Sequence, residues 1–442
     1  MLKRDSSLRQ INILKIIKKI TKRRLILDHE ASLKDYYFFT SWADSYGGWN
    51  LKRIIEKKDN LINNLKSTIK YIIFYSITNI EKYKLSGTIK KNKKKNLIIS
   101  YTNNFKISKK YDDYFSCKIK DSNKTHWFLI NFDNFKKIKK LPKNLSIFFK
   151  NKNFFYLNLK FYYNLIKYFF IILLDKKNLI NFQFNKFLRR EIVKILAESD
   201  FSKVFIPYES QPHQHYLIKI IKKFNKKIKI IGYLHSSLTP LPTDFIYKNS
   251  YEPDMLIVHG ASQKEILIRY LGWNSKKIKI INSFRYRKKP KDFFTKKIFL
   301  PFSLKRASQL LFNLRKFLEM YNLDIKKFKI INHPYMSNSR QHIEFMKKSK
   351  SFKNFQKNFQ FRRKDISIVI GVSAIILEML ENKLEVIHIC SEPIYEKHSE
   401  DIWKNIVVKK LEEGIYSYKL KKIKTLINFG KKNDFEKKFN IY

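Results

Sequence analysis

The stretch Phe328-Lys329-Ile330-Ile331-Asn332-His333-Pro334 gives the plainest indication of the fold. A short apolar run, typical of a buried strand, ends in a histidine, and Pro334 stops the strand because proline has no N–H for the ladder. A second such run, 366–370, is followed by Gly371-Val372-Ser373 and then by a helical pattern over 374–380. Buried strands that deliver polar residues to their carboxyl ends are typical of parallel α/β sheets.

These two strand ends predict a site for an anion. A hydroxyl and free backbone N–H groups at a helix N-terminus bind anions, and a neighbouring histidine can bind or protonate a phosphate. We therefore expect His333, with Pro334 beside it, and Ser373 to converge on the phosphate of an activated donor.

Composition favours a folded protein with a large excess of positive charge. The chain has 442 residues, 44% of them apolar, which suits two or three domains and argues against disorder. Its net charge is +56, from 93 Lys plus Arg against 37 Asp plus Glu. Such charge is typical of proteins that bind nucleic acid or anionic membranes. Lys, Asn, Ile, Phe and Tyr all have A/T-rich codons, however, and the lysines are scattered, so we favour base composition as the cause. Attraction to acidic phospholipids would follow in either case.

Cysteine content and hydropathy predict a cytoplasmic protein. Two cysteines, Cys117 and Cys390, exclude a disulfide framework. The N-terminal residues are polar and basic, without a signal-peptide core. The longest apolar run, Tyr168–Leu174, is far shorter than the about 20 residues that a membrane span needs. We expect a cytoplasmic location, with at most peripheral association at the inner face of the cytoplasmic membrane.

Strand-like runs alternate with helical patterns, which predicts an α/β fold of two Rossmann-like lobes facing a central cleft. A polar linker near 286–291 separates an acceptor-side lobe, 1–286, from a nucleotide-donor lobe, 287–442. The segment 145–187 gives no secure prediction, and Ser262-x-x-Glu265 predicts a capping box. The predicted strands are Tyr37–Thr40, Leu97–Tyr101, Trp127–Asn131, Val204–Pro207, Ile228–Tyr233, Met255–Val258, Ile278–Ile281, Ile298–Pro301, Phe328–Asn332, Ile366–Ile370 and Val386–Ile389.

Polar residues follow two neighbouring strands of the first lobe. Glu209 follows the apolar strand Val204–Pro207, and a carboxylate there can act as the general base for an acceptor hydroxyl. A surface glutamate or a structural cap is the alternative. Gln211, His235 and Ser236 are expected to contact donor or acceptor. For His235, a hydrogen-bonded core histidine is the alternative.

Further residues are assigned to the donor and to the glycine loop. Arg285 or Arg306 could reach the phosphate, and for Arg285 a solvated arginine is the alternative. Glu378 could accept from ribose hydroxyls, and an exposed helical glutamate is the alternative. Ser303, at the start of a helix predicted over 303–321, is assigned to the phosphate site. Asp44 and the loop Gly47-Gly48 follow the first predicted strand. Gly47 and Gly48 are expected to contact the donor or the acceptor, and tight packing alone is the alternative.

The sequence predicts no metal and no resident cofactor. His213-x-His215 beside Glu209 could suggest a metal site, but ligands at that spacing need a third partner and a converging geometry. The chain has no Asp-x-Asp, no Walker A loop and no G-x-G-x-x-G. Positive side chains and backbone dipoles must then stabilise the leaving phosphate.

The motifs His333-Pro334 and Ser373-Ala374 resemble those of bacterial two-lobed (GT-B) glycosyltransferases of surface-carbohydrate (capsule and lipopolysaccharide) biosynthesis. The chain looks most similar to sialyltransferase- and polysialyltransferase-like enzymes, which use CMP-activated sugars. The segments 208–212 and 232–236 also look like stretches of surface-carbohydrate proteins. The resemblance covers roughly 201–390, and Ala374 replaces the second hydroxyl of the Ser/Thr motif.

The resemblance implies roles for particular residues. His333 would contact the donor phosphate and assist the leaving group, and Ser373 would bind the same phosphate. The base would be a carboxylate of the N-terminal lobe, Glu209 first and Asp44 second. The acidic-Gly signature of the family is not clear in this chain.

We therefore expect an inverting, metal-independent glycosyltransferase that moves a sugar from a nucleotide donor, a CMP-sugar in preference, to a surface glycan or a lipid-linked acceptor. The nucleotide-sugar enters as a substrate, and no specific nucleic-acid partner is expected. The alternatives are a polyol-phosphate transferase of the teichoic-acid type, a basic nucleic-acid-binding protein, and a catalytically inactive two-lobed scaffold.

Overall fold

The computed structural model describes residues 6–23, 30–31, 82–87, 94–102, 112, 114–117, 119–134, 141–151, 159–173, 180–181, 183–247, 251–304, 306–336, 338–352, 366–421 and 424–442. The predicted strand Tyr37–Thr40, together with Asp44, Gly47 and Gly48, lies outside these residues.

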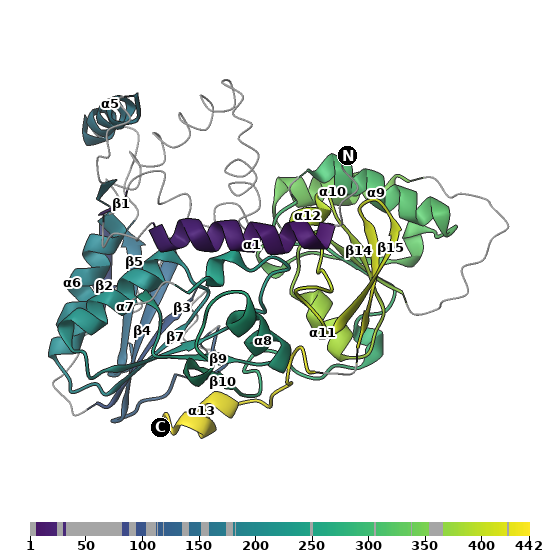
Figure 1. The fold of residues 1–442 in the computed structure, drawn as a ribbon. Coiled ribbons are helices and arrows are strands. Elements are labelled where there is room, and N and C mark those ends of the chain that lie inside the picture. The colour runs from purple at the N-terminus through teal and green to yellow at the C-terminus, as the bar shows by residue number, and fades with distance from the viewer. Residues whose placement is uncertain are drawn as a thin grey trace.

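The fold is α/β and contains two mixed sheets, of eight and six strands, which lie side by side (Figure 1). The first sheet has the order β10-β9-β8-β7-β3-β4-β5-β2, and every pairing in it is parallel except β2 with β5. Its strands are β2 (Lys82–Ser86), β3 (Asn96–Tyr101), β4 (Thr125–Asn134), β5 (Leu145–Asn151), β7 (Lys203–Pro207), β8 (Lys229–Tyr233), β9 (Met255–Val258) and β10 (Ile278–Ile280).

The second sheet has the order β12-β11-β13-β14-β16-β15, and its first four strands are parallel. β16 runs antiparallel to both of its neighbours. The strands are β11 (Lys297–Phe299), β12 (Lys329–Ile331), β13 (Ser367–Ile370), β14 (Val386–Ile389), β15 (Ile406–Glu412) and β16 (Ile415–Leu420). A separate antiparallel pair joins β1 (Glu30–Ala31) to β6 (Ile180–Asn181).

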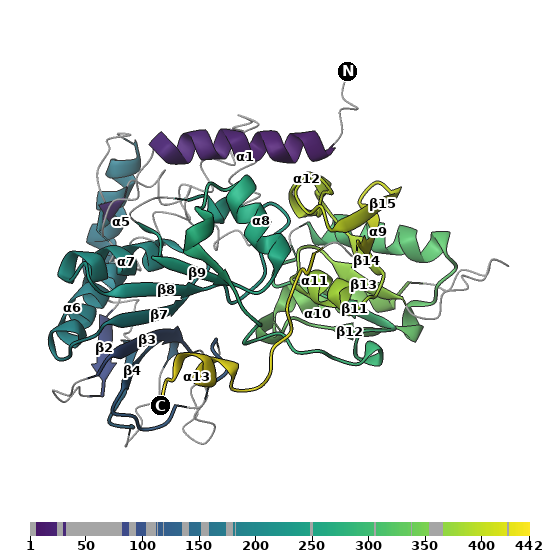
Figure 2. The same ribbon diagram turned by 60° about the horizontal axis from the view of Figure 1, so that its bottom comes forward.

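Helices cover both sheets, and α1 extends alongside both of them (Figures 1 and 2). Among the described residues, no helix combines the length and the apolar character needed to cross a bilayer. The helices are α1 (Ser6–Arg23), α5 (Leu159–Leu173), α6 (Gln183–Ala197), α7 (Pro212–Phe224), α8 (Ala261–Arg269), α9 (Ala307–Met320), α10 (Arg340–Lys350), α11 (Ile375–Glu381), α12 (Pro393–Glu396) and α13 (Asp434–Phe439).

The central strands form because short apolar runs lose water on both faces. Every residue of β3 is buried, as is every residue of β13 and β14, and continuous burial is typical of parallel strands covered by helices. The predicted strands that fall on described residues are confirmed, with ends that differ by a few residues. The segment 145–187, which had no secure prediction, contains β5, α5, β6 and the start of α6.

Segments far apart in the sequence join the two sheets. The side chain of Gln10 on α1 donates hydrogen bonds to the carbonyl oxygens of Ile394 and Lys397, both at 2.8 Å. The indole of Trp403, which is fully buried, donates to the carbonyl of Pro240 at 3.1 Å. In each bond, one partner (Gln10 or Pro240) lies on α1 or after β8 of the first sheet, and the other lies after β14 of the second sheet.

The C-terminal residues return to the first sheet. Phe435 of α13 stacks on Phe115 with ring centroids 4.3 Å apart, and its edge meets Phe205 and Phe284. The predicted limit between 286 and 287 falls between β10 of the first sheet and β11 of the second. The domain limits themselves stay a prediction.

Two local predictions about helix starts are wrong. The N-cap of α8 is Gly260, and no side chain caps it. Ser262 is buried, and its hydroxyl accepts a hydrogen bond from the side chain of Asn405, so a tertiary contact replaces the expected capping box. The helix predicted from Ser303 begins at Ala307, after Arg306 in the left-handed region (φ 51°).

Candidate active site

The residues singled out by the sequence follow the carboxyl ends of parallel strands in both sheets. In the first sheet, Glu209 follows β7, His235 follows β8 and Arg285 follows β10. In the second sheet, His333 follows β12 and Ser373 follows β13. Carboxyl ends of parallel strands share one edge of a sheet, which is where ligands bind in open α/β folds.

Arg285 brings groups from the two sheets into one electrostatic neighbourhood. Arg285 itself is exposed to solvent. Burial alone would lower the pKa of Arg285, but nearby tyrosine and glutamate side chains, Glu209 and Glu378 among them, outweigh that effect and raise it. Glu209 follows β7 of the first sheet, and Glu378 lies on α11, after β13 of the second. Carboxylates beside both sheets therefore contribute to the pKa of one guanidinium.

His333 lies in the field of the same guanidinium. Burial, followed by the charge of Arg285 and a smaller electrostatic effect of His342, lowers the pKa of His333 to about 4. Its ring meets Phe302 edge to face, with centroids 5.3 Å apart. The strand ends two residues before His333, and a 3₁₀ turn begins at Pro334, as the missing N–H of proline requires. His333 is therefore half-buried and neutral at pH 7 in the free protein.

His333 and Ser373 follow strands that lie on either side of β11. Neighbouring strands are about 4.8 Å apart, so the two strand ends are about 10 Å apart. Ser303 follows β11 and therefore lies between them in the order of the sheet. The three residues share one edge, with a spacing that a bound phosphate group and its flanking atoms could bridge.

The backbone two residues before Ser373 takes a left-handed conformation, which explains why a glycine stands at position 371. Gly371 has a φ of +58°, in the left-handed region that favours glycine, and its carbonyl accepts a hydrogen bond from Nε2 of His388 at 2.7 Å. The hydroxyl oxygen of Ser373 accepts from the N–H of Ile375 at 3.4 Å. The Ser373 hydroxyl hydrogen can still be donated to a ligand.

Glu378 is buried, so the alternative of an exposed helical glutamate is wrong. The side chain is 4% exposed and lies on α11. Its Oε1 is 2.9 Å from Nζ of Lys289, which belongs to the connection between the two sheets. A buried carboxylate needs such a partner, because charge without compensation is costly away from water.

The loop after β7 is held by side chains of α7. The amide oxygen of Gln214 accepts from the backbone N–H of Glu209 at 2.9 Å and from that of Gln211 at 3.0 Å. Gln211 is buried, at the N-cap of α7, and donates to the carbonyl of Glu209 at 3.2 Å. Ser210 takes a left-handed backbone conformation between them, with φ 57°. This arrangement fixes the backbone from which the half-buried Glu209 side chain extends.

His235 belongs to the same electrostatic neighbourhood as Arg285. Its Nδ1 donates to the carbonyl of Tyr114 at 3.2 Å, and the two rings are 4.3 Å apart. Burial lowers the pKa of His235 well below its usual value, and the charge of Arg285 lowers it further. Ser236 follows as a half-buried residue.

His259 is a member of this neighbourhood that the sequence reasoning missed. It follows β9 directly, is fully buried, and both ring nitrogens lack a hydrogen-bond partner within the described part of the chain. Burial and then the charge of Arg285 lower its pKa to about 3. The signal was present in the sequence, since Met255–Val258 is an apolar run that ends in His259-Gly260.

The two histidines of α7 do not share a metal position. His213 bonds through Nε2 to the hydroxyl of Tyr101 at 2.8 Å, whereas His215 is buried and its Nδ1 donates to the carbonyl of Tyr251 at 2.9 Å. Over the described ranges, no group of three or more His, Cys, Asp or Glu could hold a metal ion.

A scan against protein-family models gives no match, and a search of curated proteins likewise finds no match to the chain.

Proposed function

We propose that the protein is a glycosyltransferase whose two sheets form the two Rossmann-like lobes of a GT-B fold, with the donor bound between them. The single observation that carries this proposal is that Glu209 and Arg285 follow parallel strands of the first sheet, and His333 and Ser373 follow parallel strands of the second, each at its carboxyl end. The charge of Arg285, which contributes to the pKa of His333, supports the same grouping. The donor would be a nucleoside monophosphate or diphosphate sugar, a CMP-sugar in preference, and its phosphate would bind near Arg285 and His333. The acceptor would be a surface glycan or a lipid-linked sugar.

The reaction is an inverting displacement. The acceptor hydroxyl oxygen attacks the anomeric carbon from the face opposite the nucleotide, and its proton passes to the Glu209 carboxylate. The bond between the anomeric carbon and the phosphate oxygen breaks, and the nucleotide leaves with the electron pair. Arg285 and the Ser373 hydroxyl stabilise the charge that develops on the phosphate. No step requires a metal or a resident cofactor.

His333 acts on the leaving group through an N–H that it holds while neutral. A pKa of about 4 leaves the imidazole uncharged at pH 7, and a neutral imidazole still has one N–H to donate to a phosphate oxygen. An arriving phosphate would raise the pKa of His333, because a nearby negative charge favours the protonated form. The site thus supplies a neutral hydrogen-bond donor first and, once the phosphate is bound, favours the protonated imidazolium, which can give its proton to the leaving phosphate.

A thermal-shift screen tests the nucleotide. CMP, CDP, UDP and GDP are compared at near-physiological salt, because low salt would let the excess lysines bind all four. A ligand at 100 times its Kd stabilises the native state by about 2.7 kcal/mol, and we expect a cytidine nucleotide to raise the melting temperature most. Equal shifts for all four would contradict a specific donor site.

Turnover by a His333→Ala variant tests the chemistry. Loss of a positioned proton donor slows the chemical step by about 10²–10⁴-fold, and we expect this loss in kcat at saturating donor. Unchanged turnover would remove His333 from the mechanism. Supplying CDP-glycerol in place of sugar nucleotides separates this reaction from polyol-phosphate transfer.

A further inference from the structure

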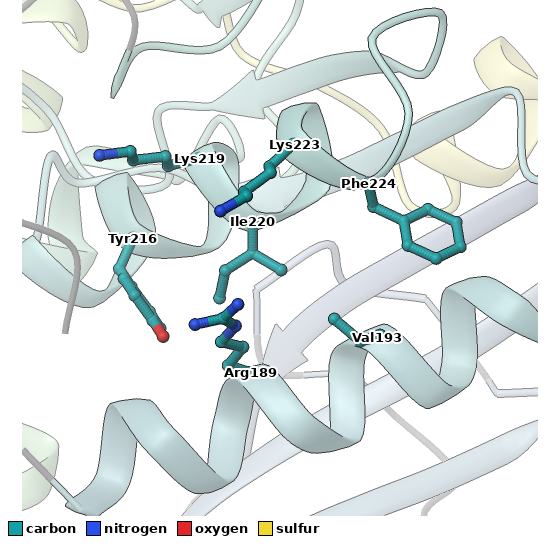
Figure 3. Close-up of a pocket in the computed structure, with 7 residues that line it drawn as sticks. All are labelled: Arg189, Val193, Tyr216, Lys219, Ile220, Lys223 and Phe224. Atoms are coloured by element: carbon teal, nitrogen blue, oxygen red, sulfur yellow. The ribbon is translucent and has the colours of Figure 1, made fainter.

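A groove between α6 and α7 combines positive charge with an apolar lining (Figure 3). It encloses about 160 Å³. Figure 3 shows the Arg189 guanidinium extending from α6 toward Ile220 and Lys223 of α7. The lining residues are Arg189, Val193, Tyr216, Lys219, Ile220, Lys223 and Phe224.

The lining of this groove is basic. Three lining residues are cationic, and no lining residue is acidic. Arg189 and Lys223 are exposed, with no acidic partner among the residues that the structure describes. Residues 212–229, which contain α7 and the turn after it, include six lysines and no aspartate or glutamate. The groove is therefore a site for a negatively charged group.

The apolar part of the lining reaches the surface. Phe224 is 43% exposed, and Ile220 lies beneath Lys223 between the two helices. The aliphatic stem of Lys219 also lines the groove, and its amine is 3.4 Å from the hydroxyl of Tyr251. An inorganic anion would use the cations alone, whereas an amphiphile would use both the cations and the apolar surface.

An exposed apolar stripe on α5 lies at the same end of the molecule as α6 and α7 in both views (Figures 1 and 2). Leu159, Tyr163 and Ile166 are 87%, 65% and 58% exposed. Their spacing of four and three residues places them on one face of the helix. A helix with aliphatic and aromatic side chains on its outer face is typical of segments that lie in a membrane interface.

We propose that the groove between α6 and α7 and the exposed face of α5 together form a docking surface for a bilayer that contains anionic phospholipids. The groove takes a lipid headgroup phosphate between Arg189 and Lys223, and α5 buries its aliphatic side chains among the acyl chains beside it. Charge alone would equally suit a polynucleotide, but a polynucleotide gives no reason for Leu159 and Ile166 to be exposed. Lipid binding does not require transferase activity, so the two proposals can fail separately.

Vesicle flotation with the full chain tests this surface. Vesicles of phosphatidylcholine with 0 or 40% phosphatidylglycerol are mixed with protein at a salt concentration of about 0.15 M, where distant charges are screened. We expect binding only to the anionic vesicles. Because each basic residue near an anionic surface strengthens binding by a few fold, the double reversal Arg189→Glu/Lys223→Glu should weaken it by about tenfold or more.

A matched variant separates the groove from the overall charge. Lys226→Glu/Lys227→Glu changes the net charge equally at exposed positions outside the groove and should weaken binding by less than about threefold. Equal losses in the two variants would show diffuse attraction and overturn the proposal. If the Arg189→Glu/Lys223→Glu variant does not melt cooperatively, the milder Arg189→Gln/Lys223→Gln variant is used in its place.

A second pair of variants tests α5. Tyr163→Ser/Ile166→Ser should lose at least about tenfold in vesicle binding, since both side chains are buried only on docking. Phe312→Ser, at a side chain on α9 that is 62% exposed, should bind as the unchanged protein does. Vesicle binding that survives the α5 change would overturn the proposal. So would an oligonucleotide result in which a single-stranded oligonucleotide abolishes vesicle binding and yet binds the groove variants as well as the unchanged protein.

Discussion

Arg285 is the residue on which the proposed site depends most. Its guanidinium stacks on its own neighbour, Tyr286, at 5.3 Å from the ring centroid, and its backbone N–H bonds to the hydroxyl of Ser283 at 3.1 Å. The backbone position is therefore fixed by Ser283, and the side chain can be changed without removing that bond. Burial lowers the pKa of His333, His235 and His259, and the charge of Arg285 adds to that effect in all three.

We predict that Arg285→Gln weakens CMP binding by about 10–100-fold, because a hydrogen bond between charged groups contributes about 1.5–3 kcal/mol. The same change should raise the pKa of His333, since a nearby positive charge is removed. Calorimetry measures the affinity, and NMR titration of the imidazole measures the pKa. Arg315→Gln is the control, because Arg315 is an exposed arginine paired with Glu319 on α9. Equal affinity of the Arg285 variant and the unchanged protein would contradict the assignment.

Among the elements, α13 connects the C-terminus to the strand end that carries Arg285. The N–H of Ser283 donates to the carbonyl of Asn428 at 2.7 Å. A side chain on Gly430 would meet the carbonyl oxygen of Ser283 at 1.9 Å, so only glycine allows this approach. On α13, Phe435 then packs against Phe205 of β7 and against Phe115 and Phe284 beside the first sheet.

We predict that Phe435→Ala lowers the free energy of unfolding by about 3–5 kcal/mol, the usual cost of removing a buried phenylalanine ring. Phe435 is 1% exposed, whereas Phe312 is 62% exposed. Phe312→Ala should therefore cost less than about 0.5 kcal/mol, as surface changes do. Urea unfolding measures both variants. Similar losses would mean that α13 is not part of the folded core.

The parallel strands and their polar ends could be predicted from sequence because each is a short apolar run that precedes a polar residue. β15 and β16 could not, since Lys409 and Lys410 interrupt the pattern and the pairing of an antiparallel edge is set by contacts elsewhere in the chain. The capping box at Ser262 failed for the same reason. Arg285 was one candidate beside Arg306, and the sequence could not show that its charge affects the pKa of His333.

At the scale of the whole molecule, buried histidines couple stability to pH. Burial lowers the pKa of His126 and His259 to about 3 and that of His388 to about 4, and all three are fully buried. In the unfolded chain these groups titrate near about 6.5, so the unfolded state binds more protons once the pH falls below that value. Stability from these groups is full above pH about 6.5 and is lost as the pH falls toward their folded values.

We predict that the free energy of unfolding falls between pH 6.5 and 5, with each fully buried histidine contributing about 1.4 kcal/mol per pH unit. His259→Phe removes one such group, and its unpaired ring nitrogens leave no hydrogen bond to lose. The slope of that variant should be smaller by about 1.4 kcal/mol per pH unit. Urea midpoints at pH 7.5, 6.5 and 5.5 give the slopes, and a slope unchanged by His259→Phe would contradict burial of its neutral form.

The location of a bound nucleotide phosphate tests the central claim most directly. A crystal structure with CMP at near-physiological salt should place the phosphate within hydrogen-bond distance of the imidazole of His333 and of the Arg285 guanidinium, between the carboxyl ends of the two sheets. A phosphate bound elsewhere, with His333 and Arg285 both free of it, would contradict the account.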